Sequence, residues 1–158
     1  MTKNLDSDGL SSIVHNYDLF YIDLWGVVHN GINLYEGAIS TLKELKKINK
    51  DFVLLTNAPR PNETVKNFLK KMGMEEEFRN HVFTSGEAAL NYLKKSHLSK
   101  KFFHIGPPRD FDLFNPFKKN NSSDLVESEY LLCTGLFDNH NNDLNYYRKM
   151  LETHTHKE

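Results

Sequence analysis

The sequence predicts an α/β protein: half of a doubly wound parallel sheet, followed by part of a second α/β unit. Apolar runs of strand length alternate with segments whose apolar residues recur at helical spacing. The first two runs and the helical segment between them fill about forty residues, which is one right-handed crossover between parallel strands. The pattern restarts near residue 101. We therefore expect a core half over residues 1–98 and a second, partial domain over residues 99–158.

The elements of the first part follow from short apolar runs and from residues that cap helices. Gly73 ends one helix, because glycine readily takes the left-handed conformation that closes a helix. Thr84, with Glu87 three residues later, forms a capping box that begins another helix. We predict strands at 19–24, 51–56 and 81–84, and helices at 9–16, 37–48, 61–72 and 85–96.

In the second part, a strand is predicted at 102–106, because the two prolines that follow cannot continue it. A second strand is predicted at 130–133, and an amphipathic helix around residues 144–151. The segment 110–117 is rich in aromatic residues, which we expect to cover the sheet of this unit rather than to contact a ligand.

The candidate site lies where the first two strands end. Asp23 ends the first strand, and Thr56 and Asn57 end the second. Carboxyl ends of parallel strands meet at one edge of the sheet, where open α/β sheets bind ligands. A carboxylate beside neutral donors suits a phosphoryl group, because the carboxylate attacks it or holds a metal while the donors bind its oxygens. The apolar run before Asp23 predicts surroundings of low dielectric constant. The alternative is that Asp23 only caps the following turn.

These residues resemble two motifs of the haloacid dehalogenase superfamily, whose sheet is Rossmann-like. Asp23-Leu-Trp-Gly-Val resembles its first motif, normally Asp-x-Asp-Gly-Thr or Asp-x-Asp-Gly-Val. Leu54-Leu-Thr-Asn57 resembles its second motif. The phrases Thr84-Ser-Gly-Glu-Ala88 and Leu132-Cys-Thr-Gly-Leu-Phe137 are similar to a branch of subclass IIA, whose cap domain is inserted between the second and third motifs.

The resemblance implies a hydrolase, in most members a Mg²⁺-dependent phosphatase that forms an aspartyl-phosphate intermediate. It makes Asp23 the nucleophile and a metal ligand, Trp25 a second ligand through its backbone carbonyl, and Thr56 and Asn57 phosphoryl-binding residues. The family has its acid/base carboxylate at the position of Trp25, and an indole cannot transfer the proton. We expect the Trp25 side chain to fill the cleft floor or to pack under the cap. His29 is the local candidate for a replacement acid, although it suits a hydrogen-bonded turn equally well.

The third and fourth motifs, which supply a lysine and acidic metal ligands, have no counterpart up to residue 158. The resemblance therefore implies an amino-terminal portion, and the sequence leaves open whether this chain is an enzyme. One interpretation is a Mg²⁺-dependent phosphatase that acts on a small phosphorylated metabolite. The other is a non-catalytic module that binds a phosphorylated ligand or pairs with another chain. The sequence does not name the substrate.

Composition narrows the choice of partners. Lys and Arg number 20 and Asp and Glu 21, and their distribution forms no basic stripe, so nucleic-acid binding is not expected. No apolar stretch approaches the roughly twenty residues of a membrane span, and the first residues lack the apolar segment of a secretion signal, so we expect a cytoplasmic protein. Without later strands, the strand at 20–24 becomes an exposed sheet edge, which predicts marginal stability or a homodimer through that edge.

Overall fold

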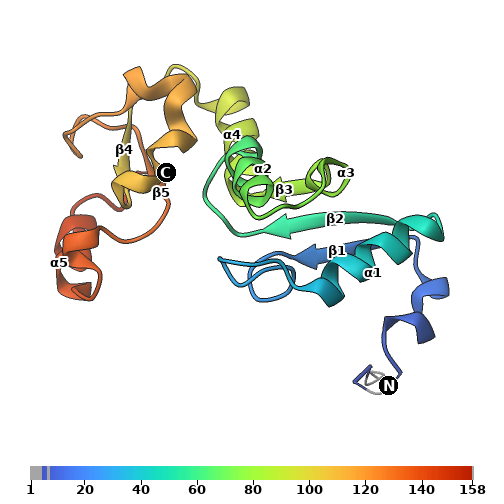
Figure 1. Ribbon diagram of the computed structural model, residues 1–158. Helices are drawn as coiled ribbons and strands as arrows, with labels where there is room; N and C mark the ends of the chain where they lie inside the picture. Colours follow the sequence, from blue (N-terminus) through green and yellow to red (C-terminus); the bar gives the residue numbers. More distant parts are fainter. Residues whose placement is uncertain (1–4, 7, 158) are drawn as a thin grey trace. The chain divides into compact units, whose positions relative to one another are not determined.

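The computed structural model describes residues 5–6 and 8–157, and their contacts divide the chain into two α/β units (Figure 1). The first unit holds the residues up to Asn57 together with Asn62–Thr84, and the second holds Ala58–Pro61 and the residues from Ser85 onward. The predicted α/β class with parallel sheets is confirmed. The contacts thus group the helix after Thr84 with the second unit, while the division into a core half and a cap stays a prediction.

The first unit is built on a three-stranded parallel sheet in the order β1-β2-β3. Asp23 is in register with Leu55, and Thr56 with Thr84, so the carboxyl ends of the strands lie at one edge. Helices α1 and α2 contact strands β2 and β3 respectively. The elements are η1 (Leu10–Ser12), η2 (Val14–Asn16), β1 (Leu19–Asp23), α1 (Glu36–Lys47), β2 (Asp51–Thr56), α2 (Asn62–Lys71), α3 (Glu76–Arg79) and β3 (Val82–Thr84).

The two faces of this sheet differ in exposure. Along β2, Phe52, Leu54 and Thr56 are buried, as alternation along a strand that faces a core requires. The opposite face carries apolar side chains that remain exposed, among them Tyr21 and Leu55. Within the described part of the chain, β1 pairs with β2 alone, so β1 is an edge strand.

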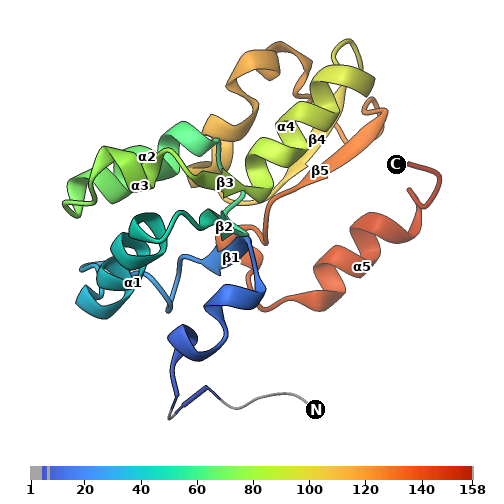
Figure 2. The same cartoon turned by 90° about the vertical axis from the view of Figure 1, so that its right-hand side faces the viewer.

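The second unit pairs β4 with β5 in parallel and surrounds them with helical segments (Figure 2). Its core joins α4, the two strands and η3 through one cluster of buried side chains: Leu90, Leu93, Phe102, Leu113, Phe114, Phe117, Tyr130 and Leu132. The elements are α4 (Ser85–Ser96), β4 (Phe102–Ile105), η3 (Pro108–Asn120), β5 (Tyr130–Cys133), η4 (Asp138–His140) and α5 (Leu144–Glu152). Phe114 and Phe117 of the aromatic segment at 110–117 thus cover the sheet of this unit, as predicted, whereas Phe111 is exposed.

Two predicted elements take a different form. The single helix expected at 9–16 is two short 3₁₀ turns separated by Ile13, whose backbone is not helical. The aromatic segment belongs to a longer 3₁₀ stretch with non-helical backbone at Phe114 and Phe117. Pro116 lies between these two residues and lacks the amide hydrogen that a regular helix needs, which accounts for the irregularity.

Candidate functional site

An open pocket of about 450 Å³ lies at the carboxyl ends of β1 and β2. Its walls contain the three residues that the sequence predicts, Asp23, Thr56 and Asn57. They also contain Tyr21 and Leu55, which sequence analysis missed. Strand alternation was the available signal for these two, because Tyr21 precedes Asp23 by two residues and Leu55 is its partner in the sheet register.

Asp23 ends β1 with its side chain exposed. One carboxylate oxygen, Oδ1, accepts a hydrogen bond from the backbone N–H of Leu24 at 2.8 Å. This bond holds the carboxylate at the strand end, and the turn-capping interpretation predicts the same contact. The expected surroundings of low dielectric constant are not present, because the strand end opens to solvent rather than into packed interior.

The two donors reach the pocket differently. Asn57 follows β2 directly and is exposed. Thr56 is only 8% exposed and belongs by alternation to the buried face of β2, whereas the register of Asp23 with Leu55 places Asp23 on the exposed face. Asn57 is therefore the more accessible of the two donors to a ligand at Asp23.

The turn after Asp23 folds around the backbone carbonyl of Leu24, which accepts from the N–H groups of Val28 and His29 at 2.9 and 3.1 Å. Gly31 takes a left-handed φ of 90° there, and a Cβ at Gly31 would lie 2.5 Å from Cη2 of Trp25. The Trp25 ring rests over this glycine and is 64% exposed. The turn thus directs the ring outward, so Trp25 does not fill a cleft floor within the first unit, and packing under the cap stays a prediction.

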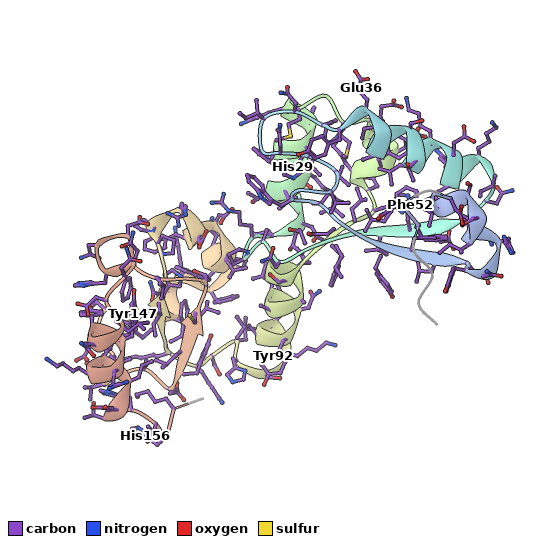
Figure 3. The ribbon with its side chains drawn as sticks, turned by 90° about the horizontal axis from the view of Figure 1, so that it is seen from below. His29, Glu36, Phe52, Tyr92, Tyr147 and His156 are labelled. Carbon is purple, nitrogen blue, oxygen red and sulfur yellow. The ribbon has the colours of Figure 1, made fainter. Side chains whose placement is uncertain are left out.

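His29, which is labelled in Figure 3, is 4% exposed and lies inside the turn. Its Nδ1 accepts a hydrogen bond from the backbone N–H of Gly31 at 3.0 Å. Its ring contacts those of Trp25 and Phe68 edge to face, at centroid distances of 5.6 and 5.7 Å. Burial lowers the pKa of His29, and the nearby charge of Asp23 opposes part of that effect. The structure thus shows His29 as a hydrogen-bonded turn residue, with a ring that favours the neutral form.

The resemblance implies two oxygen donors for a divalent cation, the Asp23 carboxylate and the Trp25 backbone carbonyl, and of these two residues Asp23 lines the pocket. Mg²⁺ prefers oxygen ligands and commonly combines one or two carboxylates with several waters. Both donors are oxygen atoms, so their chemical type suits Mg²⁺. Among the described residues, no three His, Cys, Asp or Glu side chains gather into a further metal site. One carboxylate is the lower limit for Mg²⁺, which predicts weak binding.

Comparisons with known proteins bear on the fold and the family of this chain. The family of haloacid dehalogenase-like hydrolases matches residues 20–116, more than half of the chain. A haloacid dehalogenase-like hydrolase from Brucella suis 1330 is 28% identical, with a TM-score of 0.75, covering 91% of this chain and 52% of its own. A 4-nitrophenylphosphatase from Thermotoga maritima is 24% identical, with a TM-score of 0.60, covering 86% of this chain and 49% of its own.

A glycerol phosphate phosphatase from Mycobacterium tuberculosis, in complex with magnesium, is 21% identical, with a TM-score of 0.58, covering 78% of this chain and 38% of its own. The likenesses below 25% identity show the fold alone. The chain spans about half the length of the first solved structures that it matches. No curated protein is similar enough in sequence to match it.

The comparisons also bear on two predictions from the sequence. The predicted resemblance to subclass IIA is confirmed. In the described part of the chain, no helix is both long and apolar enough to cross a membrane. The match over residues 20–116 decides the wider question: the chain belongs to the haloacid dehalogenase-like hydrolase family.

Proposed function

We propose that this protein is a phosphatase that acts on a small phosphorylated metabolite, with Asp23 as nucleophile. The observation that supports it most is the single pocket that contains Asp23, Thr56 and Asn57 at the ends of neighbouring parallel strands. Neutral donors beside one carboxylate suit the charge distribution of a phosphoryl group, since they bind its oxygens without neutralising the nucleophile. Two proteins that share its fold are named a 4-nitrophenylphosphatase and a glycerol phosphate phosphatase, which motivates the same class of substrate for this proposal.

In the proposed reaction, an oxygen of Asp23 attacks the phosphorus atom and the bond to the leaving alcohol breaks. The resulting aspartyl-phosphate is hydrolysed by water, which releases phosphate and restores the carboxylate. The Asn57 amide donates to the phosphoryl oxygens. Asp23 and the Trp25 carbonyl would hold Mg²⁺, which would supply positive charge against these oxygens. The leaving alkoxide takes its proton from water, because the indole N–H of Trp25 is too weak an acid to supply it.

A non-catalytic phosphate-binding module is the second candidate, and Trp25 is the observation that favours it. Within the described turn, neither Trp25 nor His29 supplies an acid: the first is an indole, and the second uses Nδ1 to accept from Gly31. Losing a positioned acid costs on the order of a hundredfold to ten-thousandfold in rate. Such a protein could still bind a phosphorylated ligand at Asn57.

The test is the hydrolysis of 4-nitrophenyl phosphate with Mg²⁺ by the chain and by its Asp23→Asn variant. We expect the variant to lose activity by on the order of a thousandfold or more, because the nucleophile is gone. Asp51→Asn is the matched control, since Asp51 is an exposed aspartate at the opposite end of β2. Equal rates for Asp23→Asn and Asp51→Asn would eliminate Asp23 as nucleophile. Calorimetric binding of inorganic phosphate without any turnover would favour the non-catalytic module.

A further inference from the structure

A second pocket, of about 400 Å³, lies wholly within the second unit and is separate from Asp23. It lies beside β4 and is bordered by η3, the loop at 121–123 and the start of η4. Three phenyl rings contribute to its walls: Phe103, Phe111 and Phe137. Polar side chains also line the pocket, including those of Ser123 and Asn139.

The side of this pocket that η4 forms is held in place by specific contacts. The Phe137 N–H donates to the hydroxyl of Tyr147 at 2.7 Å, and the two rings stack at a centroid distance of 6.0 Å (Tyr147 is labelled in Figure 3). Arg109 of η3 pairs with Asp138 of η4 at 2.8 Å. A ligand would therefore meet a wall that is already ordered, which lowers the entropy cost of binding.

The inner wall contains a polar side chain, His104, that already has a hydrogen-bond partner. His104 is 6% exposed, and its Nε2 lies 2.8 Å from Oγ1 of Thr134. A Cβ at Gly106 would lie 2.1 Å from this hydroxyl oxygen and 2.8 Å from the His104 Nε2, so only glycine leaves room for the pair. Burial lowers the pKa of His104, against a smaller opposing effect of Asp110. The histidine therefore presents a neutral aromatic surface rather than a cation.

The charges of the residues that line the pocket indicate whether its ligand is neutral or charged. No lysine or arginine is among the described residues that line the pocket, and its one carboxylate, on Asp138, is already paired with Arg109. A phosphate or carboxylate ligand would thus find no unpaired cation in the lining, which is unfavourable. Phenyl rings accept the C–H faces of a ring, while amide and hydroxyl side chains exchange hydrogen bonds with its hydroxyl groups.

We propose that this pocket of the second unit binds a neutral, ring-shaped polyol of the sugar class. Phe111 supplies the stacking surface, and Asn139 and Ser123 supply hydrogen bonds at the rim. This combination of apolar surface with a few directed polar groups is typical of small-molecule sites. Binding needs no phosphate group, so it does not depend on the proposed reaction at Asp23.

The test is titration of the isotope-labelled chain with D-glucose and with myo-inositol, followed by amide NMR. We expect saturable shifts at Ser123 and Asn139. Phe111→Leu keeps the apolar volume but removes the aromatic face, and should weaken binding about threefold to tenfold. Asn139→Ala should also weaken it. Asn145→Ala, the same change at an exposed position of α5 outside the pocket, should leave the affinity unchanged.

The proposal is overturned by the absence of saturable shifts at these amides, or by sugar affinities that Phe111→Leu and Asn139→Ala leave unaltered. Inorganic phosphate is the anionic probe, and tighter binding of phosphate than of the sugars at the same amides would also contradict it. Should Phe111→Leu fail to fold, the exposed Asn139→Ala still decides the question. The Asp23→Asn variant should bind the sugars as the unmodified chain does, so failure here and failure of the proposed phosphatase are distinguishable.

Discussion

Trp25 occupies the position two residues after Asp23, where the family resemblance implies a carboxylic acid. Its ring is exposed and lies over Gly31, so a smaller side chain at this position removes little packing. We predict that Trp25→Asp raises the rate of hydrolysis of glycerol phosphate by about a hundredfold to ten-thousandfold, because it restores an acid that can protonate the alkoxide leaving group. The measurement is kcat with Mg²⁺ at a series of pH values.

Trp25→Phe is the control for this change, since it removes the indole without adding an acid. A rate for Trp25→Asp no higher than that for Trp25→Phe would show that the missing carboxylate is not what limits this chain.

Two buried histidines, His29 and His104, give the stability a predictable pH dependence. Burial lowers the pKa of both His29 and His104 in the folded state, while the unfolded chain protonates them near the usual value of about 6.5. Below that value the unfolded state binds more protons than the folded state. The contribution of these two histidines to the free energy of unfolding is therefore fully present above about pH 6.5. It decreases as the pH falls below that value.

Urea denaturation at several pH values between about 7.5 and 5.5 measures this slope. The double variant His29→Gln, His104→Gln should flatten it, whatever its absolute stability. His15→Gln is the matched control, because His15 is exposed. An unchanged slope in the double variant would assign the pH dependence to other groups.

At the level of single residues, the sequence predicts well which side chains lie together at the pocket. It predicts their exposure to solvent less well. Asp23, Thr56 and Asn57 are found because strand ends are visible as the end of an apolar run, and parallel strands share an edge. Their roles stay predictions. The outward direction of Trp25 could not be predicted, because it depends on the positive φ of Gly31 and on the close approach of the two residues.

Gly86 shows how one position in α4 constrains a loop. It is buried in α4, and a Cβ there would lie 2.3 Å from the backbone N and 2.4 Å from the backbone O of Arg60. Its N–H also donates to the carbonyl of Ala58 at 3.1 Å. Backbone atoms cannot move aside as a flexible side chain can. We predict that Gly86→Ala lowers the free energy of unfolding by about 1–3 kcal/mol, as overpacking does, measured by urea denaturation.

Gly37 in α1 is the matched control, because it is also a helical glycine but a Cβ there meets nothing within 4 Å. Gly37→Ala should stabilise the protein by about 0.4–1 kcal/mol through the reduced entropy of the unfolded chain. Equal effects of the two substitutions would mean that the loop at Arg60 is free to move.

Regular elements were predictable where a local pattern determines them. The strands at 51–56 and 130–133 have the predicted bounds, because apolar runs bounded by polar residues leave little choice. The long 3₁₀ stretch of η3 could not be predicted, since aromatic residues such as Phe117 take their place from the tertiary core and override local preference.

At the scale of the whole molecule, the first unit exposes an apolar sheet face next to an edge strand. Tyr21 is 69% exposed on this face of β1, and Leu55 of β2 is exposed beside it. Parallel sheets normally have both faces covered, and unpaired edges recruit other strands. The sequence could predict the edge from the order of the strands, but not which apolar side chains would be exposed on the face.

We predict that the 158-residue chain self-associates in solution through β1 and this face. Tyr21→Lys should shift the mass measured by light scattering toward that of the monomer, because a charge on an edge strand opposes both strand pairing and the burial of the face. Tyr92→Lys makes the same change at an exposed position of α4 and should leave the mass unaltered. A monomeric mass at all concentrations, with one sharp unfolding transition, would contradict the prediction. The unpaired edge and the apolar face would then both be tolerated in water, and the stability of the first unit would rest on its buried face alone.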